Sequence, residues 1–248
     1  LVVKEQDTED GNFPTVKSPN PEDKEGFEIA IKMAKENDVD VIIGTDPDCD
    51  RVGIVVRDAD GIYRTLTGNQ TGALLVEYIL SSKKAKGTLP ENGVVIKTIV
   101  TTELAAAIAH SYGIEIMNVL TGFKWIGDQI AGLEAAGEVE RFIFGFEESY
   151  GYLAGPYVRD KDAVIGSMLI CEMAAYYRSI GSSIKQRLEE IYQQYGRYYN
   201  KVDAFSFPGL SGMDKMKGIM VSLRQNPPTE FAGKKVVETI DYAEPEKT

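Results

Sequence analysis

Three aspartates at alternating positions are the feature of this sequence that points most directly to chemistry. Asp46, Asp48 and Asp50 lie in the stretch IIGTDPDCDR, after an apolar run and immediately before Arg51. In a turn such side chains can converge, and converging carboxylates repel one another unless a cation compensates their charge. Carboxylate oxygens are the ligands that Mg²⁺ and Ca²⁺ prefer. The spacing therefore predicts a divalent-metal site, and Arg51 beside it indicates a phosphate-bearing ligand.

Other interpretations of this loop exist. One is a solvated acidic turn without a ligand. An EF-hand is excluded, because the sixth position counted from Asp46 is Arg51 rather than Gly, and the twelfth is Arg57 rather than Glu. A Mg²⁺-dependent phosphatase of the haloacid-dehalogenase type also places Asp-x-Asp after a strand. That class needs a later acidic pair, and Asp128 in IGDQIAG has no such partner.

Two further polar motifs each follow an apolar segment. Thr121-Gly122 lies between a predicted strand and a predicted helix, where a tight turn lets the backbone approach a ligand, although a simple helix cap fits equally well. Glu147 and Ser149 directly follow the apolar run 141–146. Loops past the carboxyl ends of strands are where α/β sheets bind ligands. These two side chains can hydrogen-bond neighbouring hydroxyls of a sugar, or form an exposed acidic turn.

A basic pair precedes the last long apolar segment. The stretch VRDKDAV places Arg159 and Lys161 before a predicted helix that Asp160 or Asp162 can cap. A solvated charge run is the default interpretation of such a stretch. The chain has a formal net charge of -11, so an anionic substrate would need a locally basic pocket.

The elements that position these motifs alternate between strand and helix, which predicts an α/β fold. We expect mixed, mostly parallel sheets sandwiched by helices. A helix begins at Pro21, with Asn20 as its cap. The expected strands are 39–44 (buried on both faces), 52–58, 62–66, 93–98, 114–120, 141–146, 198–209 and 234–240, with a hairpin turn at Asp60-Gly61. The later expected helices are 71–82, 101–113, 124–136, 162–181, 183–195 and 211–225.

Composition narrows the class of protein. The 248 residues include 43% hydrophobic and 26% charged residues, which is ordinary globular usage. The acidic charge argues against nucleic-acid and anionic-membrane partners. We expect two free thiols at Cys49 and Cys171 in a reducing cytoplasm, because no secretory signal is present. The chain starts without Met, so we expect it to be a piece of a longer protein.

The order of these motifs resembles the α-D-phosphohexomutase family, which comprises phosphoglucomutases and phosphomannomutases. The resemblance rests on Asp-x-Asp-x-Asp-Arg, Thr-Gly, Glu-Glu-Ser and Lys-Asp, and covers nearly the whole chain. It implies a phosphohexomutase domain type that is repeated in a four-domain enzyme. Residues 1–67 would belong to the second domain and carry the metal loop, 68–197 would form the third domain with the sugar-binding loop, and 198–248 a hinge and the truncated start of the fourth.

The resemblance also implies roles for particular residues. Asp46, Asp48 and Asp50 would hold one Mg²⁺, and Arg51 would contact the phosphate near it. The sugar-phosphate site would be lined by Thr121 and Gly122, with help from Lys97 and Lys124. Glu147 and Ser149 would grip the hydroxyls of the sugar, and Lys161 would be the general acid/base. Arg159 would add to the local positive field.

The implied reaction interconverts glucose 1-phosphate and glucose 6-phosphate through a phosphoserine and bound glucose 1,6-bisphosphate. Glu-Glu-Ser, rather than Glu-Met-Ser-Gly-His, is similar to the glucose-preferring branch. The run GFEESYGY also resembles the phosphopentomutase-like branch, so mannose and pentose phosphates stay open. A non-catalytic module that binds Mg²⁺ or sugar is a more remote alternative. The serine motif Thr-Ala-Ser-His-Asn-Pro and the Arg-Pro-Ser-Gly-Thr loop are absent from this sequence. We therefore expect the chain alone to be inactive without the missing N- and C-terminal domains.

Overall fold

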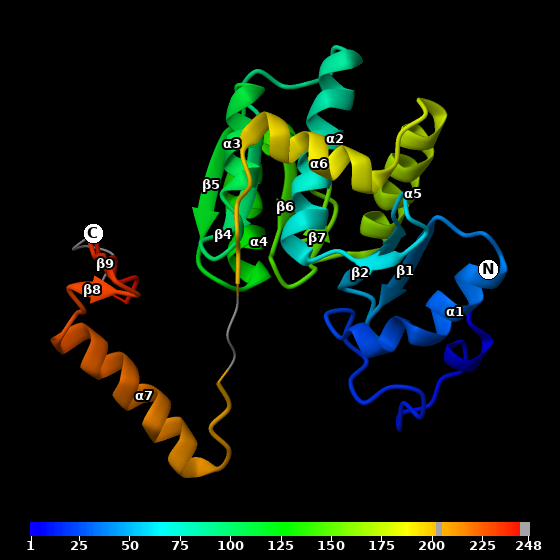
Figure 1. The fold of residues 1–248 in the computed structure, drawn as a ribbon. Helices are drawn as coiled ribbons and strands as arrows, with labels where there is room; N and C mark the ends of the chain where they lie inside the picture. Colours follow the sequence, from blue (N-terminus) through cyan, green and yellow to red (C-terminus); the bar gives the residue numbers. More distant parts are fainter. Residues whose placement is uncertain (202–204, 244–248) are drawn as a thin grey trace. The chain divides into compact units, whose positions relative to one another are not determined.

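The computed structural model describes residues 1–201 and 205–243 of the chain. They fall into two compact units, Leu1–Asn200 and Lys201–Thr248, which are described separately. The first unit combines two sheets with helices packed over them (Figure 1). The predicted class, α/β with mixed sheets covered by helices, is confirmed. Among the described helices, none has the length and apolar character needed to cross a bilayer.

The first sheet is antiparallel throughout. It has the order β1-β2-β3, and β1 pairs with β2 from Val41↔Val56 to Thr45↔Val52. The predicted hairpin is present, since β2 and β3 pair antiparallel and Gly61 in their connection has a φ of 76°. The elements of this part are η1 (Lys4–Gln6), η2 (Lys24–Phe27), α1 (Glu28–Glu36), β1 (Val41–Thr45), β2 (Val52–Arg57) and β3 (Tyr63–Thr65).

Two local expectations in this part were wrong. The helix does not begin at Pro21 but at Glu28, because Asp23 caps a preceding 3-10 turn by accepting the N–H of Glu25. β1 is not buried on both faces. Only Ile42 of its five residues is buried, because β1 lies at the edge of the sheet.

The second sheet has the strand order β5-β4-β6-β7, in which β4, β5 and β6 are parallel and β7 is antiparallel to β6. Val94 and Ile96 of β4 pack with α4, whereas Val95 packs with α2 and α3, so helices cover both faces. The elements are α2 (Gly68–Ala85), β4 (Val94–Thr98), α3 (Leu104–Ser111), β5 (Glu115–Val119), α4 (Phe123–Ala135), η3 (Val139–Arg141), β6 (Phe142–Phe146), β7 (Tyr152–Leu153), α5 (Ala163–Ser179) and α6 (Ile184–Tyr195).

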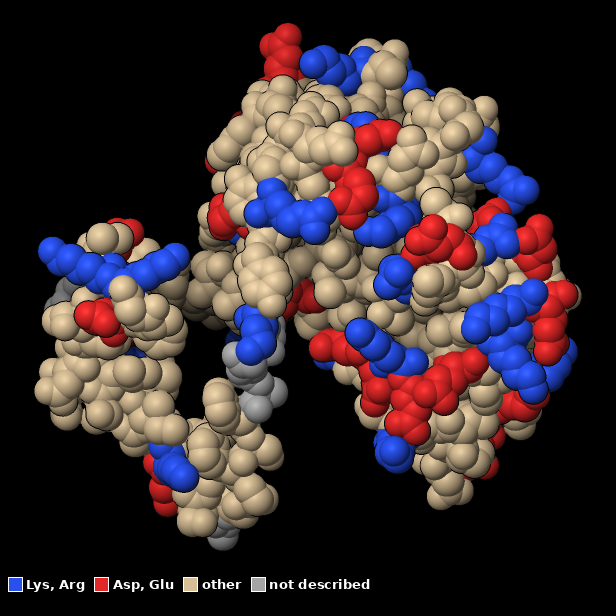
Figure 2. Space-filling view, in the orientation of Figure 1, with Lys and Arg blue, Asp and Glu red and all other residues tan. Residues whose placement is uncertain are grey.

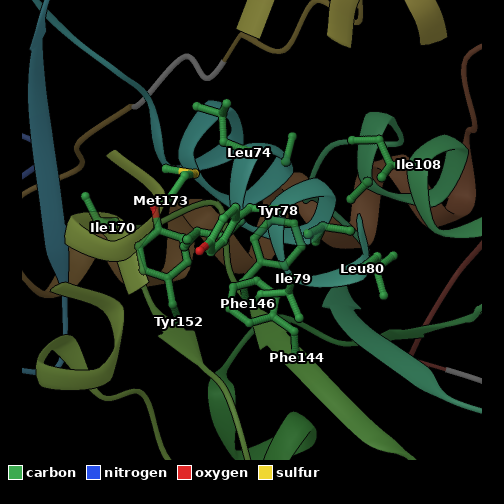
Figure 3. Close-up of a cluster of buried hydrophobic side chains, with 14 of the residues drawn as sticks. Leu74, Tyr78, Ile79, Leu80, Ile108, Phe144, Phe146, Tyr152, Ile170 and Met173 are labelled. Atoms are coloured by element: carbon green, nitrogen blue, oxygen red, sulfur yellow. The ribbon is translucent and has the colours of Figure 1, made fainter. Parts of the chain in front are cut away.

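A stack of aromatic rings forms the centre of the main core (Figure 3). The ring centroids of Phe144 and Phe146 lie 5.6 Å apart, and those of Phe146 and Tyr152 lie 6.5 Å apart. Helix α2 lies close to these rings because position 72 is glycine. A Cβ on Gly72 would come within 2.1 Å of the Phe146 ring. This packing fixes the carboxyl end of β6, where the Glu-Glu-Ser loop (residues 147–149) begins.

The beginning of β2 lies against the turn that follows β6. The N–H of Val52 donates to the carbonyl of Tyr150 at 3.0 Å, and Arg51 and Gly151 form an isolated antiparallel bridge. Helix α5 approaches Val52 closely at Gly166, where a Cβ would come within 2.9 Å of Val52 Cγ1. The backbone therefore places the aspartate loop (residues 46–50) beside the Glu-Glu-Ser loop.

The second unit contains α7 (Leu210–Gln225) and a hairpin of β8 (Glu230–Phe231) and β9 (Lys234–Lys235). The strand expected over 198–209 is not present in its described residues, and residues 202–204 lie outside the described part. The strand expected over 234–240 is reduced to two residues.

Candidate functional site

The aspartate loop is shaped by one of its own carboxylates. Asp46 Oδ1 accepts the N–H of Asp50 at 3.1 Å and that of Arg51 at 2.9 Å, while Cys49 adopts a φ of 57°. This turn brings ligand oxygens of Asp46, Asp48 and Asp50 within 4.8 Å of one another. The convergence that alternate spacing predicted is therefore present in the fold.

The electrostatics of this cluster suit a cation. Burial raises the pKa of Asp46, the N–H of Arg51 lowers it, and the carboxylates of Asp50 and Asp48 raise it further, with a net increase. A divalent ion would remove this repulsion. Three carboxylate oxygens form a hard donor set, which fits Mg²⁺ or Ca²⁺.

Lys161 connects the aspartate loop to the rest of the unit. Its Nζ lies 2.6 Å from Asp50 Oδ2, and its side chain is only 13% exposed. The methylene groups of the Lys161 side chain pack over Gly151, where a Cβ would come within 2.2 Å of Lys161 Cδ. Burial lowers the pKa of Lys161, but the hydrogen bond and the attraction of Asp50 outweigh this effect and raise it overall. The group is therefore an ammonium ion held at the aspartate cluster.

Glu147 is nearly buried where β6 ends. It is 5% exposed, and its Oε1 accepts the N–H of Gly122 at 3.1 Å. Gly122 has a φ of 115°, a conformation that favours glycine, so the strand-to-helix turn can present this N–H. Burial raises the pKa of Glu147, although the nearby Lys161 lowers it. The Thr-Gly turn and the Glu-Glu-Ser loop thus meet directly.

The remaining predicted ligands lie around this junction. Thr121 is exposed beside Gly122, and Ser149 is half-buried in the Glu-Glu-Ser loop. Lys124 is exposed in the first turn of α4, with its Nζ 5.0 Å from the centroid of the Trp125 ring. These side chains are accessible to a ligand.

The guanidinium of Arg51 borders the metal cluster. Its Nε lies 3.8 Å from both Asp46 Oδ2 and Asp50 Oδ1, and an Nη lies 3.5 Å from Glu22. Nε is buried and has no hydrogen-bond partner among the described residues. Arg51 therefore places this N–H, unpaired in the described part of the chain, at the edge of the aspartate cluster. On the face seen in Figure 2, acidic and basic side chains are interspersed over the larger unit.

Two predicted cations have partners outside this group. Lys97 is fully buried, and its Nζ donates to the carbonyl of Thr101 at 3.1 Å and to Glu103 at 2.7 Å. Arg159 pairs with Glu134 on α4. The described contacts therefore give Lys97 a role in fixing a loop, and its phosphate contact stays a prediction.

Glu148 is the residue that the sequence argument left without a role. Its Oε2 accepts from the hydroxyl of Thr98 at 2.9 Å and from that of Thr101 at 3.1 Å. The signal in the sequence is the threonine-rich stretch TIVTT (98–102), which begins at the last residue of β4, because parallel strands bring their carboxyl ends to one edge. Which side chain meets these hydroxyls depends on the strand order.

Comparison with known proteins identifies the family. The family model described as phosphoglucomutase/phosphomannomutase, alpha/beta/alpha domain III matches residues 67–195, more than half of the chain. The model for domain II of the same family matches residues 1–61. The chain belongs to the α-D-phosphohexomutase family. The two matches follow one another in the order that the motif series predicted.

Relatives of this phosphohexomutase chain include bacterial phosphoglucomutases. That of Staphylococcus epidermidis is 41% identical over 247 residues, which are 100% of this chain and 44% of the relative. That of Staphylococcus aureus is 40% identical over 241 residues, 97% of this chain and 42% of the relative. The chain thus spans less than half the length of these curated relatives.

Solved structures share the fold. A phosphoglucomutase/phosphomannomutase family protein from Burkholderia thailandensis matches with a TM-score of 0.61 and 20% identity, over 92% of this chain and 42% of that one. A putative phosphomannomutase from Thermus thermophilus matches with a TM-score of 0.56 and 23% identity, over 72% of this chain and 36% of that one.

Proposed function

We propose that the chain is the central part of a phosphoglucomutase that interconverts glucose 1-phosphate and glucose 6-phosphate. Residues 1–67 would contribute the end of its second domain, 68–197 its third domain, and 198–248 a hinge and the start of its fourth. The observation that carries the proposal is the 2.6 Å contact between Lys161 and Asp50, which joins the metal loop to the sugar-binding side of the unit. The relatives named phosphoglucomutase support the same reaction.

In this proposal the aspartate loop binds the cofactor. Asp46, Asp48 and Asp50 hold one Mg²⁺, and their converging oxygens fit it. When bound, the ion neutralises charge on the phosphoryl group that is transferred. Arg51 would contact the same phosphate through its guanidinium, of which Nε has no hydrogen-bond partner among the described residues.

The third domain binds and orients the sugar phosphate. Thr121 and Gly122 would line the site of the distal phosphate at the amino end of α4, with help from Lys124. Glu147 and Ser149 accept and donate hydrogen bonds to the sugar hydroxyls. Burial removes water from the Glu147 carboxylate and so raises its pKa. A sugar hydroxyl that donates to this carboxylate would supply a hydrogen bond in place of the missing water.

Lys161 would move the proton in each half-reaction. Its ammonium lies against Asp50, and its raised pKa keeps it charged near neutral pH. A charged group there would stabilise the transferring phosphoryl, give its proton to the departing oxygen and take up the proton that the attacking hydroxyl releases, so that it is an ammonium again after each transfer. A phosphoserine from a domain outside this chain would donate to the free hydroxyl of the sugar, giving glucose 1,6-bisphosphate. That intermediate would then reverse its orientation in the site and return its other phosphate to the serine.

A coupled assay tests this proposal. The full-length parent should convert glucose 1-phosphate to glucose 6-phosphate, detected by glucose-6-phosphate dehydrogenase, whereas the chain alone should not. Lys161→Met in the parent should lower kcat by roughly 10²-fold or more. Glu138→Ala, at an acid that pairs with Arg141 instead, is the matched control. Turnover by the chain alone would place the nucleophile inside this sequence, and an inactive parent would overturn the assigned reaction.

A further inference from the structure

Glu148 lies between the two residues to which the proposal gives the sugar hydroxyls, yet its own side chain is directed elsewhere. Its Oε2 is bound by the hydroxyls of Thr98, the last residue of β4, and Thr101, in the loop that follows. Both threonines are buried, at 0% and 2% exposure. The Oε2 oxygen of Glu148 therefore serves as an acceptor for two buried hydroxyls of the protein itself.

The geometry of the three oxygens makes this anchor hard to replace. The two threonine hydroxyls lie 2.6 Å from each other, in addition to their contacts with Glu148. Each hydroxyl carries one hydrogen, so when one donates to the other, the second still donates to Glu148. Without the carboxylate, a buried hydroxyl would lose its acceptor, and leaving such a group unpaired is costly.

The loop that carries the threonines is itself fixed. The Nζ of Lys97 donates to the carbonyl of Thr101, and the N–H of Thr102 donates to Asn69 Oδ1 at 3.0 Å. Asn69 lies in the first turn of α2, next to Gly68. The carboxylate of Glu148 is therefore bound to a loop that a buried lysine and the start of a helix hold in place.

The backbone of Glu148 is held from the same direction. A Cβ on Gly68 would come within 2.0 Å of the carbonyl oxygen of Glu148, so α2 touches the loop directly. Two residues further along, the carbonyl of Tyr150 accepts the N–H of Val52, the first residue after the aspartate loop and Arg51. A displacement at Glu148 would thus act on the sugar-binding loop, whereas the aspartate loop is held by its own hydrogen bonds to Asp46 Oδ1.

We propose that Glu148 is a positioning residue that aligns Glu147 and Ser149 with the sugar by anchoring their loop to Thr98 and Thr101. This inference rests on the proposed sugar-binding role of Glu147 and Ser149. It assigns the second glutamate of Glu-Glu-Ser to the orientation of the loop, and it assigns Lys97 to the support of the threonine loop.

Binding to the chain tests the inference with three variants. Glu148→Ala removes the acceptor, the double variant Thr98→Val with Thr101→Val removes the donors at nearly constant volume, and Glu148→Gln keeps an acceptor oxygen. Calorimetry with glucose 1,6-bisphosphate should show roughly tenfold weaker binding for the first two and a smaller loss for Gln. Affinity for inorganic phosphate and for Mg²⁺ should stay near wild type, because neither ligand uses the sugar-binding loop. Glu138→Ala is the matched control.

Hydrogen exchange supplies a readout that needs no ligand. The amide of Glu147 bonds to the carbonyl of Gly151 at 2.9 Å within this loop. Exchange across residues 147–152 should be about tenfold faster in Glu148→Ala and in the double valine variant, and nearly unchanged in Glu148→Gln. Partial rescue by Gln separates loss of the anchor from general destabilisation.

Each outcome decides one of the two proposals. The positioning role would be overturned if Glu148→Ala bound glucose 1,6-bisphosphate as tightly as the wild type, or if its hydrogen exchange at 147–152 were unchanged. If the wild-type chain binds no glucose 1,6-bisphosphate, the proposed sugar site fails, while the exchange measurement still decides whether Glu148 anchors the loop. A uniform loss of affinity for sugar phosphate, phosphate and Mg²⁺ would also contradict the inference, since that result indicates collapse of the whole site.

Discussion

Replacing Asp48 by Asn tests the metal site with little disturbance of the fold. Asp48 is the exposed member of the aspartate cluster. Asp46, in contrast, accepts the N–H groups of Asp50 and Arg51, so a change there alters the turn as well. Asp48→Asn removes one negative charge and keeps the size of the side chain.

The expected loss of Mg²⁺ affinity follows from Coulomb's law. A divalent ion about 2 Å from one carboxylate oxygen gains about 4 kcal/mol even at the dielectric constant of water. The amide and hydration recover part of this, leaving about 2.7 kcal/mol, or roughly 100-fold in affinity. At a concentration about 100 times the wild-type Kd, Mg²⁺ should stabilise the wild type by about 2.7 kcal/mol and the variant by only about 0.4 kcal/mol.

Thermal unfolding with and without Mg²⁺ measures this difference. For a unit of this size, about 1 kcal/mol corresponds to about 2–4 °C in Tm. The wild type should therefore gain about 5–10 °C and Asp48→Asn about 1–2 °C. Asp128→Asn, at an exposed aspartate on α4, should behave as the wild type. An equal gain in wild type and Asp48→Asn, or no gain in the wild type, would refute the metal assignment.

Three further changes have expected outcomes in denaturant or thermal unfolding. Glu77→Ala should destabilise by about 3 kcal/mol, because it removes the buried carboxylate 2.5 Å from Arg187 and leaves this guanidinium, among the described carboxylates, only its pair with Glu190; a loss under about 1 kcal/mol would contradict this. Glu147→Gln should raise Tm near neutral pH. Burial raises the folded-state pKa of Glu147, so the stability it contributes is present below the unfolded pKa and declines as pH rises through the folded pKa. The difference in Tm between Glu147→Gln and the wild type should shrink toward pH ~4. A difference that does not depend on pH would contradict the raised pKa of Glu147. Gly127→Ala should cost about 1–3 kcal/mol, because its Cβ would lie 2.5 Å from the carbonyl of Arg159, and an unchanged midpoint would mean that this loop moves freely.

Local patterns predicted most elements of the first unit. Apart from η3 and β7, which were not predicted, the apolar periodicity placed the helices and strands from residue 68 to 195 within a few residues of their observed bounds, since each pattern reflects which face of one element is buried. The start of α1 was wrong because Asn20-Pro21 and Asp23 are both plausible start signals, and only the packing of Phe27 over Gly44 selects between them. β1 was wrong in burial because a strand's place in the sheet is not encoded in its own sequence.

The candidate site also has a part that the sequence predicted and a part that only the structure shows. The sequence by itself determined the aspartate loop, since spacing alone makes three carboxylates of one short turn converge. It also determined the family through the order of its motifs. Only the tertiary structure brought Lys161 to Asp50, which is 111 positions away, and Glu148 to the threonines after β4. Such contacts depend on strand order and on which groups pack against glycines such as Gly151 and Gly68, and these are properties of the packed chain and not of any single segment.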